Sequence, residues 1–159
     1  MTHAIRALAP PLSAPLAPLY MTMTLRLRRT CPLDLTDHVA LLRHAVALAQ
    51  KTCGLDVQAA VVLPREVRLL CRGARFEDQF IRAARQVAAS ASHHAGDAGA
   101  IDWQPPDLTG VPPHRLDAER SALEDAPVRA GLVTRAEDWP YSSVHRRRRA
   151  LPILGAGLA

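Results

Sequence analysis

The chain has 159 residues, which is enough for one compact domain with tails but not for two full domains. Hydrophobic residues make up 48% of the chain and aromatic residues only 4%, so the core has to be built mainly from Leu, Val and Ala. No run of about 18 apolar residues is present, and we therefore expect neither a transmembrane helix nor a membrane partner.

Charge and cysteine content indicate the kind of partner and the compartment to expect. Twenty Lys and Arg residues against fifteen Asp and Glu residues give a formal net charge of +5. A positive balance of this size is compatible with a polyanionic partner such as nucleic acid, without requiring one. The cysteines Cys31, Cys53 and Cys71 form no CxxC pair. They are typical of free or buried thiols in a cytoplasmic protein.

The two ends of the chain differ from its middle. Residues 1–19 repeat Pro, Leu and Ala, which breaks the periods of helix and strand and predicts a disordered tail. Residues 146–159 are a basic run followed by an apolar segment, which predicts a second tail. The folded domain is therefore expected to span residues 20–145.

The first predicted element is a half-buried strand over residues 20–29, because apolar and polar residues alternate strictly there. One side of this strand carries Met21, Met23, Leu25 and Leu27, and the other carries Thr22, Thr24, Arg26 and Arg28.

A helix is predicted after the turn at residues 32–36. Asp34 or Thr36 can cap it by accepting a hydrogen bond from an unpaired N–H of its first turn. Gly54 is placed to end it. Its apolar stripe consists of Val39, Leu42, Val46, Ala49 and Cys53.

Two strands, at 55–63 and 66–72, follow on either side of a turn at residues 64–65, and a second helix covers about 75–91. The buried stripe of that helix consists of Phe76, Phe80, Ala83, Val87 and Ala91. The order strand–helix–strand–strand–helix predicts an α+β fold, the ferredoxin-like sandwich, with helices on one side of an antiparallel sheet.

The last third of the chain has weaker signals. Residues 92–113 are rich in Gly, Pro and His, which predicts a loop with a short strand or turn near 101–103. A third helix is predicted over residues 117–125, with Asp117 as its cap and Pro127 as its stop.

The most specific motif of the chain lies near its end. Residues 126–133 read APVRAGLV, and residues 137–143 read EDWPYSS. Upstream, residues 61–70 read VVLPREVRLL, and Trp103 and Gln104 follow later. In order and spacing these segments resemble the signature of the REP-associated tyrosine transposases, an IS200-like family that acts on single-stranded DNA. The resemblance covers roughly residues 20–145.

The resemblance implies a fold, a chemistry and a substrate class. Members of the family carry two histidines at i and i+2 on a strand, which hold Mg²⁺ or Mn²⁺, and a helical tyrosine attacks the phosphorus. Their substrates are single-stranded DNA ends, often at hairpins. Carried over by motif, the two histidine positions fall on Glu66 and Arg68. The tyrosine position falls on Ala122, and the family's Asn falls on Ala126.

All three of those catalytic positions are substituted here. Glu66 and Arg68 are expected to form an ion pair in place of a metal site, so we expect no cofactor. Ala122 has no nucleophilic atom, which leaves Ser121, Tyr20 and Tyr141 as the alternatives. The sequence therefore predicts a copy that has lost DNA cleavage.

Contacts to DNA are expected from basic side chains that flank the resembling segments. These are Arg26, Arg28, Arg129, Arg146, Arg147, Arg148 and Arg149. Each phosphate contact would make binding weaker as the salt concentration rises. For the run 146–149 a solvated basic tail is an equal alternative. Trp139 and Tyr141 offer rings for base stacking, although packing is favoured for both.

No metal site is expected from the histidines. His93 and His94 are adjacent in a predicted loop, where neighbours rarely bind one ion. His38, His44 and His114 are isolated in the sequence.

Two other functional classes stay open. One is a small interaction domain or decaying transposase remnant without affinity for DNA. The other is an active nuclease that uses Glu66, together with Asp56 and an unconventional nucleophile.

Overall fold

Four antiparallel strands form one sheet in the order β2–β3–β1–β4, which confirms the predicted α+β sandwich. The computed structural model describes residues 18–73, 77–95 and 101–146. The strands are β1 (Leu19–Arg26), β2 (Asp56–Val62), β3 (Glu66–Gly73) and β4 (Asp107–Gly110). The α-helices are α1 (Val39–Cys53), α2 (Glu77–His94), α3 (Leu116–Glu124) and α4 (Ala126–Arg129). Short 3-10 turns are η1 (Leu35–His38), η3 (Pro113–Arg115) and η4 (Ala136–Asp138).

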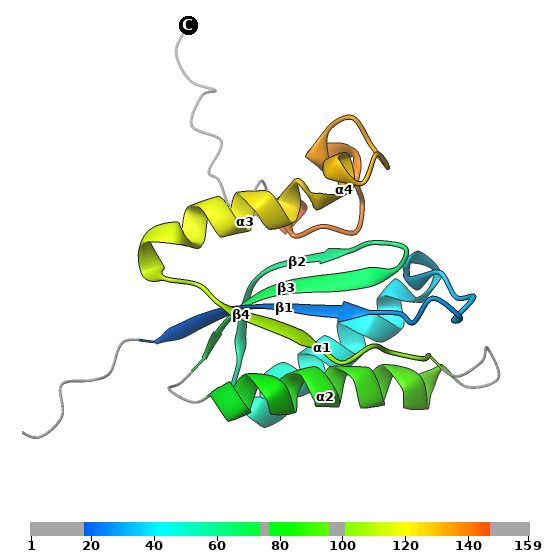
Figure 1. Cartoon of the computed structure of the whole chain (residues 1–159), viewed down its shortest axis with the longest axis horizontal. Helices are drawn as coiled ribbons and strands as arrows, with labels where there is room; N and C mark the ends of the chain where they lie inside the picture. The colour runs from blue at the N-terminus through cyan, green and yellow to red at the C-terminus, as the bar shows by residue number, and fades with distance from the viewer. Residues whose placement is uncertain (1–17, 74–76, 96–100, 147–159) are drawn as a thin grey trace, which may run out of the picture.

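Helices cover both faces of this sheet. Figure 1 shows α1 and α2 on one face and α3 on the other, where it packs over β2 and β3. The prediction that the helices lie on one side is therefore wrong. The reason is Leu70 of β3, which is fully buried although its neighbours on that face are polar. With Ala59 and Val61 of β2 it forms an apolar surface, which Leu123 of α3 covers.

The larger core lies between the sheet and the α1–α2 pair. Phe80 of α2 is 0% exposed and Leu42 of α1 is 1% exposed, and both belong to this core. The alternation predicted for the first strand is confirmed, because its apolar side faces this core. Those buried side chains are Met21, Met23, Leu25 and Leu27.

The sequence signals for helix ends correspond to local geometry. Asp34 accepts a hydrogen bond from the backbone N–H of Thr36 at 2.8 Å, at the beginning of η1. Gly54 ends α1 with a φ of 68°, a conformation that glycine adopts without strain. At Gly73 an added Cβ would lie 2.8 Å from Cζ of Phe80, so the absence of a side chain lets α2 pack closely on β3.

The end of the second helix differs from the prediction. It extends to His94 and not to residue 91, because no Gly or Pro interrupts the chain before Gly96. His93 and His94 therefore belong to a helix and not to a loop. Phe76, predicted to begin its buried stripe, lies outside the described residues.

The elements after α2 are also shifted. The fourth strand lies at Asp107–Gly110 and not near 101–103, where Trp103 forms only an isolated bridge with Leu27. The third helix begins at Leu116, before the predicted cap Asp117, and no side chain caps it. Pro127 does not stop the helical segment, because it lies in the first turn of α4. The backbone N–H groups of a first turn have no partner within the helix, so a proline is tolerated there.

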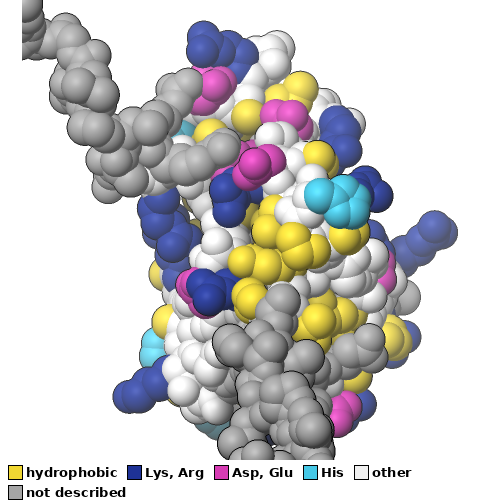
Figure 2. All heavy atoms as spheres, turned by 90° about the vertical axis from the view of Figure 1, so that its left-hand side faces the viewer, with side chains coloured by type: hydrophobic (Ala, Val, Ile, Leu, Met, Phe, Trp, Pro, Cys, Tyr) yellow, Lys and Arg dark blue, Asp and Glu magenta, His cyan; other side chains and the backbone are white. Residues whose placement is uncertain are grey.

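The surface is mixed in charge. Figure 2 shows one side of the molecule on which Lys and Arg side chains alternate with Asp and Glu around a central group of hydrophobic side chains. No helix within the described parts of the chain is long and apolar enough to cross a membrane. The predicted tails fall almost entirely on residues 1–17 and 147–159, which lie outside the described residues.

Candidate functional site

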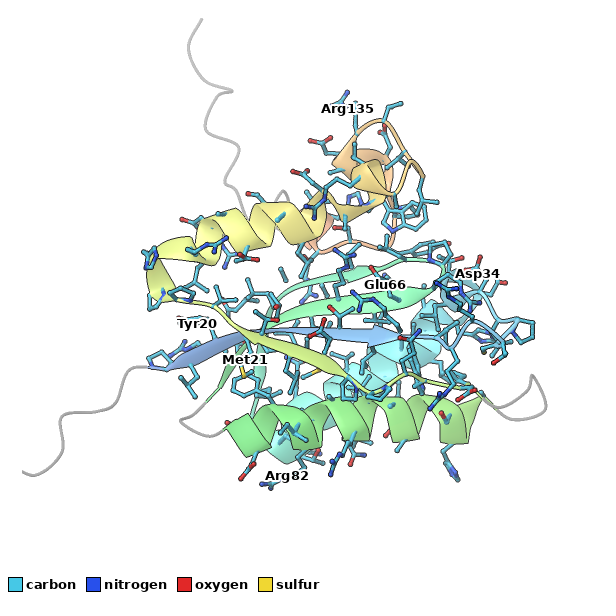
Figure 3. All side chains as sticks on the ribbon, in the orientation of Figure 1. Tyr20, Met21, Asp34, Glu66, Arg82 and Arg135 are labelled. Carbon is cyan, nitrogen blue, oxygen red and sulfur yellow. The ribbon has the colours of Figure 1, made fainter. Side chains whose placement is uncertain are left out.

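A charged cluster lies on the sheet face that α3 partly covers (Figure 3). Glu66 begins β3, and Arg68 follows two residues later on the same face. Arg26, the last residue of β1, is the cross-strand partner of Glu66. Arg26 Nε donates to Glu66 Oε2 at 2.7 Å, and Arg68 Nε donates to Oε1 at 2.5 Å. Both carboxylate oxygens therefore hold a guanidinium, and the ion pair predicted between Glu66 and Arg68 is confirmed.

The exposure of these side chains differs. The side chain of Glu66 is 14% exposed, that of Arg68 33% and that of Arg26 43%. A second carboxylate, Asp107 of β4, has its Oδ2 3.7 Å from Arg26 Nη1 but is 59% exposed. Such an exposed contact contributes little, so Glu66 is the group that orients both arginines.

Asp56, the other carboxylate considered for a nuclease, does not join this cluster. It pairs with Arg72 at the far end of the β2–β3 hairpin, whereas Glu66 stands where that hairpin turns. Its carboxylate accepts a hydrogen bond from Gln58 at 2.6 Å.

The cluster does not fit a divalent cation. Mg²⁺ and Mn²⁺ require several oxygen ligands, and both oxygens of Glu66 already bind guanidinium groups. Arg68, which pairs with the same carboxylate, adds a positive charge that repels a cation. Within the described residues no group of three or more His, Cys, Asp and Glu side chains could hold a metal ion. The cluster presents N–H donors, which suit an anion.

The position predicted for the nucleophile lies on α3. Ala122 is half-buried there, and its backbone carbonyl accepts a hydrogen bond from Nη2 of Arg129 in α4. The chain then turns through Gly131, whose φ is 71°, so that the N–H of Leu132 reaches the carbonyl of Pro127 at 3.0 Å. The hydrogen bond from Arg129 therefore holds α4 against the end of α3.

The second part of the signature segment binds the free edge of β2. Trp139 Nε1 donates to the carbonyl of Val62 at 2.8 Å, and its ring meets Tyr141 edge-on at a centroid distance of 5.5 Å. Ser143 exchanges backbone and side-chain hydrogen bonds with Ala60 at 2.8 and 3.0 Å. Both aromatic rings thus have structural contacts, as favoured from the sequence.

The opposite face of the sheet has a groove of about 730 Å³ between α1 and the β2 edge. Its lining is largely apolar, from residues such as Val46 and Val57, with Arg43, His145 and Arg146 also present. Arg146 therefore lies on the other side of the sheet from Arg26, and the two do not line one groove. Arg147, Arg148 and Arg149 lie outside the described residues.

Two further arginines make polar contacts in the loop after β1. Arg28, a predicted DNA contact, is 55% exposed, and its Nε lies 3.0 Å from Asp102 Oδ1. Arg65, in the hairpin turn, donates to the carbonyls of Arg28, Cys31 and Leu33 at 2.6 to 3.1 Å. The sequence analysis missed this role, since no local pattern distinguishes Arg65 from a solvated turn residue.

The cysteine thiols differ in burial. All three cysteines are free, and burial, with the charge of Asp56 nearby, raises the pKa of Cys71 to about 12. Such a thiol is protonated at neutral pH and does not serve as a nucleophile.

Comparison with known proteins bears on this architecture. No family model matches the chain. It is 28% identical over 144 residues to the REP-associated tyrosine transposase of Escherichia coli (strain K12), which covers 87% of this chain and 84% of that protein. The solved structure of a REP-associated tyrosine transposase bound to a REP hairpin is 24% identical. That structure shares the fold with a TM-score of 0.75 over 95% of this chain and 93% of the other. The chain is therefore similar to the REP-associated tyrosine transposases in sequence and shares their fold.

Proposed function

We propose that this protein binds single-stranded or hairpin DNA in the manner of a transposase, in the cytoplasm, and does not cut it. Support for binding comes from its relatives, one of which was solved with a REP hairpin. The net charge of +5 has the sign that a DNA partner requires. The observation that carries the proposal is Glu66, whose two carboxylate oxygens are held by the guanidinium groups of Arg26 and Arg68.

Loss of cleavage follows from that observation together with Ala122. A carboxylate held by two guanidinium groups offers no free ligand to a divalent ion, and a methyl group cannot attack phosphorus. The alternative nucleophiles have other surroundings. Ser121 is exposed and turned by about 100° from Ala122 around the helix. Tyr20 packs partly against the α3-side core, and Tyr141 lies in the groove on the other face.

Contacts to the DNA backbone are assigned to the predicted basic positions. In the described part of the chain these are Arg26, Arg28, Arg129 and Arg146, and the run 147–149 continues from the last of them. Arg26 has most of the support, because it is oriented by Glu66 and remains 43% exposed.

The test uses the purified full chain and a fluorescent DNA hairpin with a single-stranded extension. Anisotropy is measured over a series of salt concentrations, and a denaturing gel detects cut DNA or a covalent adduct in the presence of Mg²⁺ or Mn²⁺. We expect binding that weakens steeply with salt, and neither product. A metal-dependent adduct would contradict the loss of cleavage, and its mapped position would identify the nucleophile.

A second candidate is a small interaction domain without affinity for DNA. It is favoured by the ion pairs Arg26–Glu66, Arg28–Asp102 and Arg115–Glu119, which neutralise part of the described basic surface. The same salt series separates the two candidates, since this one predicts no binding even at low salt.

A further inference from the structure

We infer that Glu66, Arg26 and Arg68 form a metal-independent site for one backbone phosphate of DNA, with Glu66 as its positioning residue. This inference rests on the proposed DNA binding and assigns a ligand to the charged cluster. It also gives a function to residues that do not fit a divalent ion.

The carboxylate of Glu66 fixes both cations. Each of its oxygens accepts a hydrogen bond from a different guanidinium, at 2.7 Å from Arg26 and 2.5 Å from Arg68. The two donors come from neighbouring strands, β1 and β3, which are held in register by the sheet. A charge-assisted pair of this kind reduces the rotamer freedom of two long side chains before any ligand arrives.

Both guanidinium groups keep donors for a ligand. A guanidinium has five N–H groups, and among the described residues the polar contacts of Arg68 are made to Glu66, through Nε and Nη2. Its Nη1 remains available, and the side chain is 33% exposed. Arg26 uses Nε for Glu66, and within the described ranges of the chain its Nη1 makes the long 3.7 Å contact to Asp107. The remaining N–H groups match the oxygens of a phosphate.

The local charge also favours an anion. Two guanidinium groups against the one half-buried carboxylate of Glu66 leave one positive charge, which equals in size the charge of one DNA phosphate. Asp107 reduces this charge only weakly, because it is 59% exposed and screened by solvent. The site therefore supplies with fixed N–H donors the positive charge that a metal ion would otherwise supply.

The decisive variant removes the site without changing the net charge. In Glu66→Gln/Arg68→Met one negative and one positive charge disappear together, so non-specific attraction to DNA is unchanged. The variant also leaves no unpaired half-buried carboxylate, and such exchanges are often neutral for stability. The control is Arg82→Ala on the exposed side of α2, far from Glu66 in Figure 3, which removes a positive charge outside the site.

Hairpin binding is measured by anisotropy over a salt series, with EDTA or with Mg²⁺ at equal ionic strength. For the double variant we expect affinity to fall about tenfold and the salt slope to fall by about 1, while Arg82→Ala changes affinity by less than about twofold. For the unchanged protein we expect the same affinity in EDTA and in Mg²⁺. Far-UV circular dichroism and thermal unfolding verify that each variant is folded, and Arg26→Gln is the second variant should the first not fold.

The outcomes separate this inference from the proposed function. If the unchanged protein does not bind the hairpin at low salt, the proposed DNA binding fails. If it binds but the folded double variant, or Arg26→Gln in its place, retains affinity and salt slope, only the phosphate site is wrong. Binding that is lost in EDTA would overturn its independence of metal.

Discussion

The two faces of the sheet differ in what they bury. The face toward α1 and α2 is apolar along β1 and β3, with Met23, Leu25, Val67 and Leu69 all buried there. The face toward α3 is apolar only at part of β2 and β3. At the beginning of β3 it carries the cluster of Glu66, Arg26 and Arg68.

This difference indicates which side chains of the sheet can be substituted while the fold is retained. A fully covered face tolerates little change, because each buried side chain fills space that no neighbour can fill. On the partly covered face the charged side chains reach solvent, so their identity can change while the fold is retained. Variation in chemistry is therefore expected mainly on the α3 side of the sheet.

The largest effect is expected on the covered face. Phe80→Ala removes a ring that is 0% exposed, which should lower the free energy of unfolding by about 3–5 kcal/mol. Urea denaturation followed by circular dichroism measures this change. The fraction that stays folded should bind the hairpin with unchanged affinity, and a large loss of affinity there would break the contrast between the faces.

A smaller effect is expected from a single change in the charged cluster. Arg68→Ala leaves Glu66 with one guanidinium in place of two, so we expect a loss of about 1–2 kcal/mol in the free energy of unfolding. The double variant Glu66→Gln/Arg68→Met should lose less, because no carboxylate is left short of a partner. Equal losses in the two variants would show that Glu66 does not orient the arginine.

The next smaller effect is expected from Trp139, which binds the edge of β2. Trp139→Phe keeps a ring but removes the hydrogen bond to Val62, which should cost about 1 kcal/mol of stability and leave hairpin affinity unchanged. Thermal unfolding and anisotropy on the same preparation check both statements. A loss of affinity without a loss of stability would instead assign Trp139 to base stacking.

The smallest effect concerns Cys71 and appears only at high pH. Burial raises the pKa of this thiol from 9.0 to about 12, so the folded state favours the protonated form. Stability from this group is therefore complete below pH 9 and is lost as the pH rises toward 12. At pH 8 we expect iodoacetamide, followed by mass spectrometry, to label the less buried Cys53 and to spare Cys71. Rapid labelling of Cys71 would contradict its burial.

Much of the fold could be predicted because its signals are local. Alternation in residues 20–29, the cap at Asp34 and the glycine at Gly54 depend on neighbours a few residues away, and the structure has the elements that they predict. The charged pair of Glu66 and Arg68 could also be anticipated, since residues at i and i+2 of a strand share a face. The similarity to the REP-associated tyrosine transposases could be predicted as well, since the segments that carry it are continuous in the sequence.

Other features depend on residues that are distant in the sequence. The position of α3 was decided by Leu70 and its β2 neighbours, which form an apolar surface only when the strands pair. Arg26 reaches Glu66 across forty residues, and Arg65 reaches the loop after β1 in the same way. The place of β4 was likewise set by pairing with β1 and not by its own weak pattern.

The sequence by itself determined the order of the first five elements and the apolar side of β1 that faces the larger core. Only the tertiary structure decided that Glu66 has two arginine partners and that Arg26 and Arg146 lie on opposite faces. Local patterns fix dihedral angles and faces, which involve residues within one turn or one strand. Contacts between strands depend on register and packing over the whole chain, and no short window of sequence contains them.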